Sequence, residues 1–174
     1  MTFGIPVVMD GKLNYGTEVK LHKIVNEYED GAMDVVFKAL RAFKIERFYK
    51  DFNGKSYSGA DVSFLDNEED GLATQRLIYI DLLKQLYNLL KISIPEIDIN
   101  KTTSFTYAHK LGLTLSQEYH LLTMKKESER LKYLQDHLNI SIPVLQQMEK
   151  AKEVARLNGH IKNFDPLDFS DLAF

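Results

Sequence analysis

Residues 115–138, with the sequence LSQEYHLLTMKKESERLKYLQDHL, form the longest stretch of the chain that keeps one clear period without glycine or proline. Apolar residues recur at steps of three and four, as on one face of an α-helix, while glutamates and lysines fill the other face. The stretch predicts one amphipathic helix, or two short helices joined near residues 123–126. Such a stripe identifies a buried face but no chemistry. It comprises Leu115, Tyr119, Leu122, Leu131, Leu134 and Leu138.

The composition is that of a folded protein. A chain of 174 residues, 44% apolar and 27% charged, can bury the core of one domain or of two small ones. The absence of cysteine excludes disulfides, thiolate metal sites and cysteine nucleophiles, and it suits a reducing compartment. No apolar run approaches the roughly 20 residues that span a bilayer, and no signal peptide is visible, so we expect a cytoplasmic protein without a membrane anchor. The net charge of −3 argues against nucleic acid as a general partner.

Alternating residues in the first part of the chain predict an antiparallel sheet with one buried face. A β-branched run over residues 3–9 ends at the turn residues Asp10 and Gly11. Residues 17–27 alternate between apolar and charged side chains, and the turn signal at residues 29–31 leads into a further alternation over residues 33–37. The two segments therefore predict a β-hairpin.

Residues 34–50 are compatible with either a helix or a strand. Basic residues three apart would line one face of a helix, whereas in a strand Ala42 and Phe43 would point to opposite sides. We interpret the segment as a strand with a bend near Ala39 and Leu40. A turn signal at Asn53 and Gly54 then precedes a further strand over residues 57–65.

The composition changes at residues 66–71, DNEEDG, which we interpret as an acidic hinge and a domain boundary. Helical patterns follow over residues 72–92 and 103–111, and Thr114 with Gln117 has the spacing of a capping box at the start of the opening stretch. Ile142 and Pro143 are expected to open a last helix that ends at Asn158 and Gly159. Residues 160–174 form an aromatic and acidic tail.

Known motifs for catalysis and metal binding are weak or missing. Asp66, Glu68 and Asp70 match the first positions of a calcium loop, but Leu77 stands where the loop needs a glutamate. None of the five histidines has the spacing of a helical zinc pair, so we interpret them as surface or half-buried residues. The sequence also lacks a G-x-S-x-G elbow and a phosphate-binding loop. We expect no catalytic residue, no metal and no cofactor.

A basic series interleaved with aromatic residues is the one feature that a nucleic-acid interpretation could use. Lys38, Arg41, Lys44, Arg47 and Lys50 alternate with aromatic residues between positions 37 and 49. Acidic residues at positions 34, 46 and 51 dilute this series, so a strand with solvated charges is the preferred interpretation.

Two stretches together resemble the LON substrate-binding domain, the PUA-like N-terminal domain of ATP-dependent Lon proteases, which is also found as a stand-alone bacterial protein. The strand-rich stretch carries GIPVV at 4–8, GTEV at 16–19, DG at 30–31, MDVV at 33–36, RAFKI at 41–45 and YSGADV at 57–62 with Leu65. The helical stretch carries AHKLGL at 108–113, Gln117, LL at 121–122, and ERL at 129–131 with Leu134. The resemblance extends from about residue 3 to residue 145.

The chain departs from the family's pattern in two places. The family's domain starts with an apolar strand that contains a proline, a loop and a short helix, and nothing comparable precedes Phe3. We therefore expect a truncated form, or a barrel whose missing edge a partner chain supplies, including a homo-oligomer that forms through an exposed strand edge. Ala39 stands where the family tends to have glycine, which puts the expected bend in question.

The resemblance implies an α+β fold. A mostly antiparallel PUA-like β domain of LON type, residues 1–66, lacks the usual first strand and helix and precedes a small helical bundle, residues 67–159, and the tail 160–174. The implied function is a non-enzymatic module that binds unfolded or partner protein segments, with RNA binding by a PUA-like protein as the alternative. As a partner-binding surface we select aromatic residues at strand ends, which are Tyr15, Phe48, Tyr49, Phe52 and Tyr57.

Overall fold

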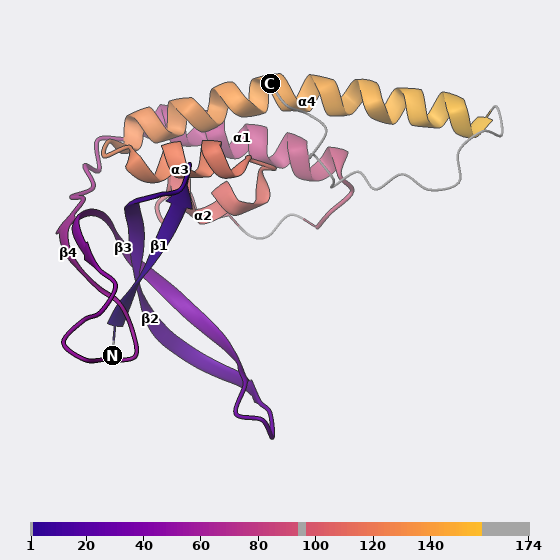
Figure 1. Ribbon diagram of the computed structural model, residues 1–174. Coiled ribbons are helices and arrows are strands. Elements are labelled where there is room, and N and C mark those ends of the chain that lie inside the picture. Colours follow the sequence, from indigo (N-terminus) through magenta and orange to yellow (C-terminus); the bar gives the residue numbers. More distant parts are fainter. Residues whose placement is uncertain (1, 94–96, 158–174) are drawn as a thin grey trace. The chain divides into compact units, whose positions relative to one another are not determined.

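The computed structural model describes residues 2–93 and 97–157, which belong to two compact units, Met1–Asp66 and Asn67–Phe174 (Figure 1). The first unit is a sheet and the second is helical, so the fold class is α+β as expected from the sequence. The expected helix end at Asn158 and the tail 160–174 lie outside the described residues.

The first unit is a four-stranded antiparallel sheet in which neighbours in sequence are neighbours in space, in the order β1-β2-β3-β4. Its strands are β1 (Thr2–Met9), β2 (Lys12–Glu27), β3 (Met33–Tyr49) and β4 (Gly59–Phe64). β2 begins five residues before the expected start at residue 17. The tight turn at Asp10 and Gly11, both with positive φ, brings Lys12 directly opposite Met9, so pairing extends the strand where the apolar pattern is missing.

The ambiguous segment is a strand, and its expected bend coincides with an irregularity in pairing. Glu18 lies opposite Arg41 and Val19 lies opposite Ala39, so Leu40 is an extra residue on β3. Such a bulge bends a strand and increases its twist. A second shift lies further along, where Ile45 faces Val62 and Arg47 faces Asp61.

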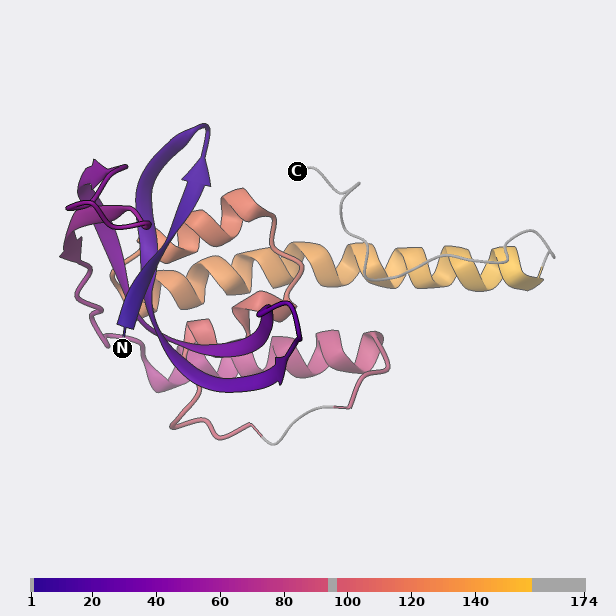
Figure 2. The same cartoon turned by 60° about the horizontal axis from the view of Figure 1, so that its bottom comes forward.

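Beyond the last residue pair of β1 and β2, the strands β2 and β3 continue alone as a two-stranded arm, residues 21–37. Thr2 of β1 pairs with Lys20, and from Leu21 opposite Phe37 to Glu27 opposite Met33 the described residues form pairs between β2 and β3 only. Figures 1 and 2 show this arm leaving the rest of the sheet. A backbone hydrogen bond of 2.9 Å from Tyr28 N to Ala32 O closes its tip.

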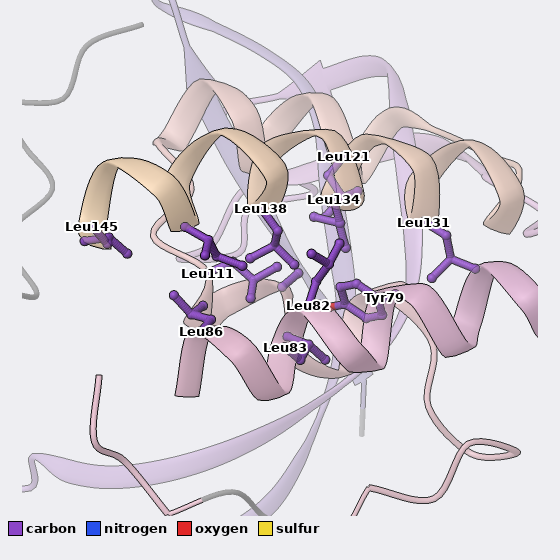
Figure 3. Close-up of a cluster of buried hydrophobic side chains, with 12 residues drawn as sticks. Tyr79, Leu82, Leu83, Leu86, Leu111, Leu121, Leu131, Leu134, Leu138 and Leu145 are labelled. Atoms are coloured by element: carbon purple, nitrogen blue, oxygen red, sulfur yellow. The ribbon is translucent and has the colours of Figure 1, made fainter. Parts of the chain in front are cut away.

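The second unit is a helical bundle around one buried apolar cluster. Its helices are α1 (Ala73–Leu89), α2 (Ser104–Tyr107), the 3₁₀ turn η1 (Ala108–Lys110), α3 (Leu115–Thr123) and α4 (Glu127–Leu157). Figure 3 shows leucines of α1 and α4 meeting in this cluster, where Leu83, Leu131, Leu134 and Leu138 are fully buried. The apolar stripe of the opening stretch is therefore the core side in α4 only. In α3 the buried residue is Leu121, which the predicted stripe omitted, whereas Leu115 of the stripe is 59% exposed.

The opening stretch forms two helices rather than one, as the second sequence alternative predicts. α3 has the expected capping box, because Thr114 N–H donates to Gln117 Oε1 at 2.9 Å and Gln117 N–H donates to Thr114 Oγ1 at 3.3 Å. The start of the last helix at Pro143 is wrong: α4 runs through this residue without a break. Ile142 and Leu145 continue the buried face beside it, whereas Pro143 is exposed, so tertiary packing overrides the proline.

The acidic segment 67–71 is docked onto the start of α4 instead of being a free hinge. Glu68 N–H donates to Lys125 O and Glu127 N–H donates to Glu68 O, each at 2.9 Å. Asp70 accepts hydrogen bonds from the backbone N–H and the hydroxyl of Ser128, at 2.9 and 2.7 Å. Two of these bonds satisfy N–H groups of the first turn of α4, those of Glu127 and Ser128, so the carboxylate of Asp70 caps this helix.

Candidate binding groove

An apolar groove of about 470 Å³ lies on the sheet of the first unit. All four strands contribute to its lining, including the two edge strands β1 and β4. The sheet is therefore curled, since residues of both edges face the same space. Its apolar lining includes Phe3, Pro6, Phe43, Ile45, Phe48, Val62 and Phe64.

Two glycines allow the floor of the groove to form. A Cβ at Gly16 would lie 2.5 Å from Ile5 O and 2.6 Å from Phe43 Cζ, and one at Gly4 would lie 2.9 Å from the same Phe43 atom. The Phe43 ring can lie across these positions only because neither residue has a side chain. It is 4% exposed and is one of the few buried side chains of this unit.

One ion pair lies at the groove. The guanidinium of Arg41 donates through Nε and Nη2 to Glu18 Oε2, at 3.0 and 2.9 Å, and lies 3.6 Å from the centroid of the Phe64 ring. Glu18 is largely covered, whereas Arg41 is half exposed. The pair balances the carboxylate charge, so the groove presents an apolar surface without net charge.

Of the five aromatic residues selected from the sequence, Phe48 is the one that lines the groove. The ring of Phe52 packs over Gly59 and lies 6.3 Å from the ring of Tyr49, whose hydroxyl donates to Asp61 Oδ2 at 2.7 Å. Tyr57 is 58% exposed in the loop before β4, and Tyr15 is half-buried on β2 opposite Lys44; neither lines the groove.

Sequence reasoning missed most of the groove residues, although a signal for some of them was present. The alternation of Phe43 with Ile45, and of Val62 with Phe64, placed each pair on one face of its strand. Phe3 and Pro6 carried no such signal, because only the curl of the sheet brings β1 to the same groove as β4.

The helical unit contains a buried cluster of polar residues. Ser104 donates through its N–H and hydroxyl to the two carboxylate oxygens of Glu127, both at 2.7 Å, and Arg130 donates to Glu127 Oε2 at 2.9 Å through Nη2. These three residues are at most 1% exposed. A serine next to a carboxylate could suggest a nucleophile, but its hydroxyl is engaged and no substrate can reach it. We therefore assign the cluster a structural role.

Within residues 2–93 and 97–157, no three His, Cys, Asp or Glu side chains lie close enough to hold a metal ion. Asp70, once a candidate calcium ligand, is held by Ser128, whose hydrogen bonds lower the pKa of this carboxyl. Burial raises the pKa of Tyr79, which keeps its hydroxyl protonated inside the bundle. Among the described helices, none is both long and apolar enough to cross a bilayer.

Comparison with solved structures relates this architecture to two N-terminal domains of Lon. One is the crystal structure of a Lon N-terminal domain protein from Xanthomonas campestris, with a TM-score of 0.57 and 21% identity over 77% of this chain and 74% of that chain. The other is the N-terminal domain of a Mycobacterium avium complex Lon protease, with a TM-score of 0.53 and 15% identity over 80% of this chain and 90% of that chain. No family model and no curated protein matches the sequence.

The fold defines an α+β protein in which a curled antiparallel sheet precedes a helical bundle. More particularly, it is a Lon N-terminal-domain-like fold. The resemblance found in the sequence is thereby confirmed at the level of the fold.

Proposed function

We propose that the chain is a non-enzymatic protein-binding module whose groove holds an extended, apolar segment of an unfolded or partner protein. The observation that carries this proposal is that both edge strands line one uncharged apolar groove. An extended segment could place its side chains in the groove while its backbone pairs with a free edge, which is a common mode of peptide recognition. The likeness to Lon N-terminal domains supports the same assignment.

The edges of the sheet also bear on the choice of partner. β1 carries no charged residue, so an uncharged segment meets no electrostatic barrier at this edge. Pro6 has no backbone N–H, so one position of the edge has no hydrogen-bond donor. A second copy of this chain is one such partner, since it carries the same edges. The proposal places the protein in the cytoplasm, in keeping with its cysteine-free sequence.

Peptide binding to matched variants tests the groove. Phe48 and Tyr57 are both exposed aromatic residues of the first unit, but only Phe48 lines the groove. We expect Phe48→Ala to weaken binding of a fluorescent apolar peptide by about tenfold, as for a central aromatic contact, and Tyr57→Ala to leave it unchanged. Fluorescence anisotropy measures both affinities, and circular dichroism checks that each variant is folded.

Other outcomes of this experiment would change the assignment. Equal losses of peptide affinity in Phe48→Ala and Tyr57→Ala would show that the peptide binds a wider aromatic surface rather than the groove. No binding of any apolar peptide by the folded chain would contradict the proposal.

RNA binding remains the alternative, but the geometry gives it less support. Lys44 is paired with Glu46 at 3.5 Å, and the guanidinium of Arg47 stacks at 5.9 Å from the ring of Tyr49, whose hydroxyl is bound to Asp61. The basic series is therefore partly neutralised. An RNA oligonucleotide in the same anisotropy assay distinguishes the two functions, because RNA binding would be strongest at low salt and would fall steeply as salt is added.

A further inference from the structure

The arm formed by β2 and β3 exposes more apolar surface than a free two-stranded ribbon tolerates. Leu21, Ile24, Val25 and Met33 are 42%, 46%, 52% and 51% exposed. Beyond Lys20, no other strand among the described residues pairs with the arm, and much of its apolar surface is exposed. Isolated two-stranded ribbons are marginal in water, and exposed apolar patches of this kind mark interaction surfaces.

Charge is segregated along the same arm. The tip is acidic and carries Glu27, Glu29, Asp30 and Asp34. The root is basic: it carries Lys23 and, directly next to the arm on each strand, Lys20 and Lys38. The surface charge of the arm therefore changes from positive at the root to negative at the tip.

The basic root contains a repulsive pair without a counter-ion. Lys20 lies directly opposite Lys38, and like charges in this position destabilise a sheet. In the described part of the chain neither lysine forms an ion pair, and neither do Glu27 and Glu29 at the tip. Acidic groups brought to the root would relieve this repulsion.

We propose that the arm is a self-association surface, on which a second copy of the chain docks its own arm in antiparallel orientation. A two-fold axis near the middle of the arm then places each acidic tip beside the basic root of the other copy, and the exposed apolar residues of both arms cover one another. The parallel orientation would instead place tip beside tip and root beside root. Because both copies use the same surface, the contact closes as a dimer.

Charge reversal on the full-length chain tests this arrangement. Lys20→Glu with Lys38→Glu makes the root net acidic while it preserves a like-charged pair across the strands, and Glu27→Lys with Glu29→Lys cancels the negative charge of the tip. Sedimentation velocity should show that each double variant raises the dimer Kd by about tenfold or more. Lys12→Glu with Lys55→Glu, the matched control outside the arm in the same unit, should leave the Kd unchanged.

Mixing the two reversed variants gives the decisive result. At one end of the heterodimer the unchanged acidic tip of one variant meets the unchanged basic root of the other, and at the other end the introduced lysines face the introduced glutamates. The mixture should therefore associate more tightly than either variant alone, and added salt should weaken the association. Circular dichroism spectra of all variants check that the arm is still folded.

A wild-type chain that sediments as a monomer at every concentration would overturn the proposal. So would a dimer whose Kd is unchanged by the substitutions in the arm, or a mixture of the two variants that fails to associate. A series of growing oligomers would show open-ended edge pairing instead of a closed contact. The inference is independent of groove binding, because peptide affinity is measured separately on the same variants.

Discussion

At the scale of single residues, Arg130 joins several parts of the helical unit. Its guanidinium donates to the carboxylate of Glu127 and to the carbonyl oxygens of Met124 and Lys125, both at 2.8 Å, and it lies 4.7 Å from the centroid of the Phe105 ring. A lysine offers a single charged group and cannot serve all these acceptors in a fixed plane. Arg130 therefore binds the backbone of the loop between α3 and α4 and also neutralises the buried carboxylate of Glu127.

Arg130→Met tests this role. The substitution keeps a long side chain but leaves the carboxylate of Glu127 buried without its counter-charge. We expect a loss of about 3–5 kcal/mol in the free energy of unfolding, as for other buried pairs that lose one partner. Urea denaturation followed by circular dichroism measures it. A loss below about 1 kcal/mol would show that the cluster is hydrated and weak.

Asp70 gives the stability of the chain a specific pH dependence. Its folded-state pKa lies below the ordinary value of 3.8 because Ser128 donates two hydrogen bonds to the charged form. Because the pKa is lowered on folding, the ionised carboxylate of Asp70 stabilises the folded state above pH 3.8, and this stabilisation is lost as the pH falls through the folded-state pKa. Asp70→Asn should therefore lower the urea midpoint at neutral pH, and the difference from wild type should shrink in acid. A constant difference would rule out the charge as its cause.

At the scale of secondary-structure elements, the sequence predicted the strands better than the last helix. Period-two alternation and turn residues located β1, β3 and β4 within a few residues, because both signals are local. The continuity of α4 through Pro143 is not local, since it depends on Ile142 and Leu145 packing in the core. The groove was not predicted from the sequence for the same reason. It depends on the curl of the sheet, which follows from the close approach of Phe43 to Gly16 and from the bulges, and neither is visible in a short stretch of sequence.

The buried face of α4 is tested by comparing two leucines of the opening stretch. Leu131 is fully buried, whereas Leu115 at the start of α3 is 59% exposed. Leu131→Ala should cost about 2–5 kcal/mol of unfolding free energy because it leaves a cavity in the core. Leu115→Ala should change it by less than about 0.5 kcal/mol. Equal effects of the two substitutions in urea titrations would mean that the assignment of the faces is wrong.

At the scale of the whole molecule, the two units differ in how much of their apolar surface they bury. The apolar cluster around Leu83 and Leu134 belongs entirely to the helical unit, whereas the sheet buries only Val19, Ala42 and Phe43 among its apolar side chains. The change in composition at residue 66 indicated two kinds of structure. It gave no indication that the sheet would leave so much apolar surface exposed.

This difference predicts that residues 67–174 fold alone. The fragment retains the complete apolar cluster and the polar cluster of Ser104, Glu127 and Arg130. We expect a helical circular dichroism spectrum and a cooperative urea transition from it, because its core needs nothing from the sheet. The fragment 1–66 should unfold at lower urea concentration. A disordered 67–174 would contradict the assignment of a self-contained helical unit.

The docked segment 67–71 also determines how mechanical force passes along the chain. Leu65 N–H is bonded to Ala42 O in the sheet, and Glu68 N–H is bonded to Lys125 O in the bundle. Only Asp66 and the backbone of Asn67 separate these two anchor points, so the covalent connection between the hydrogen-bonded residues is two residues long. A pull on a segment held by the sheet would reach the first turn of α4 at once, and the bonds of Glu68 and Asp70 would be the first in the bundle to bear tension.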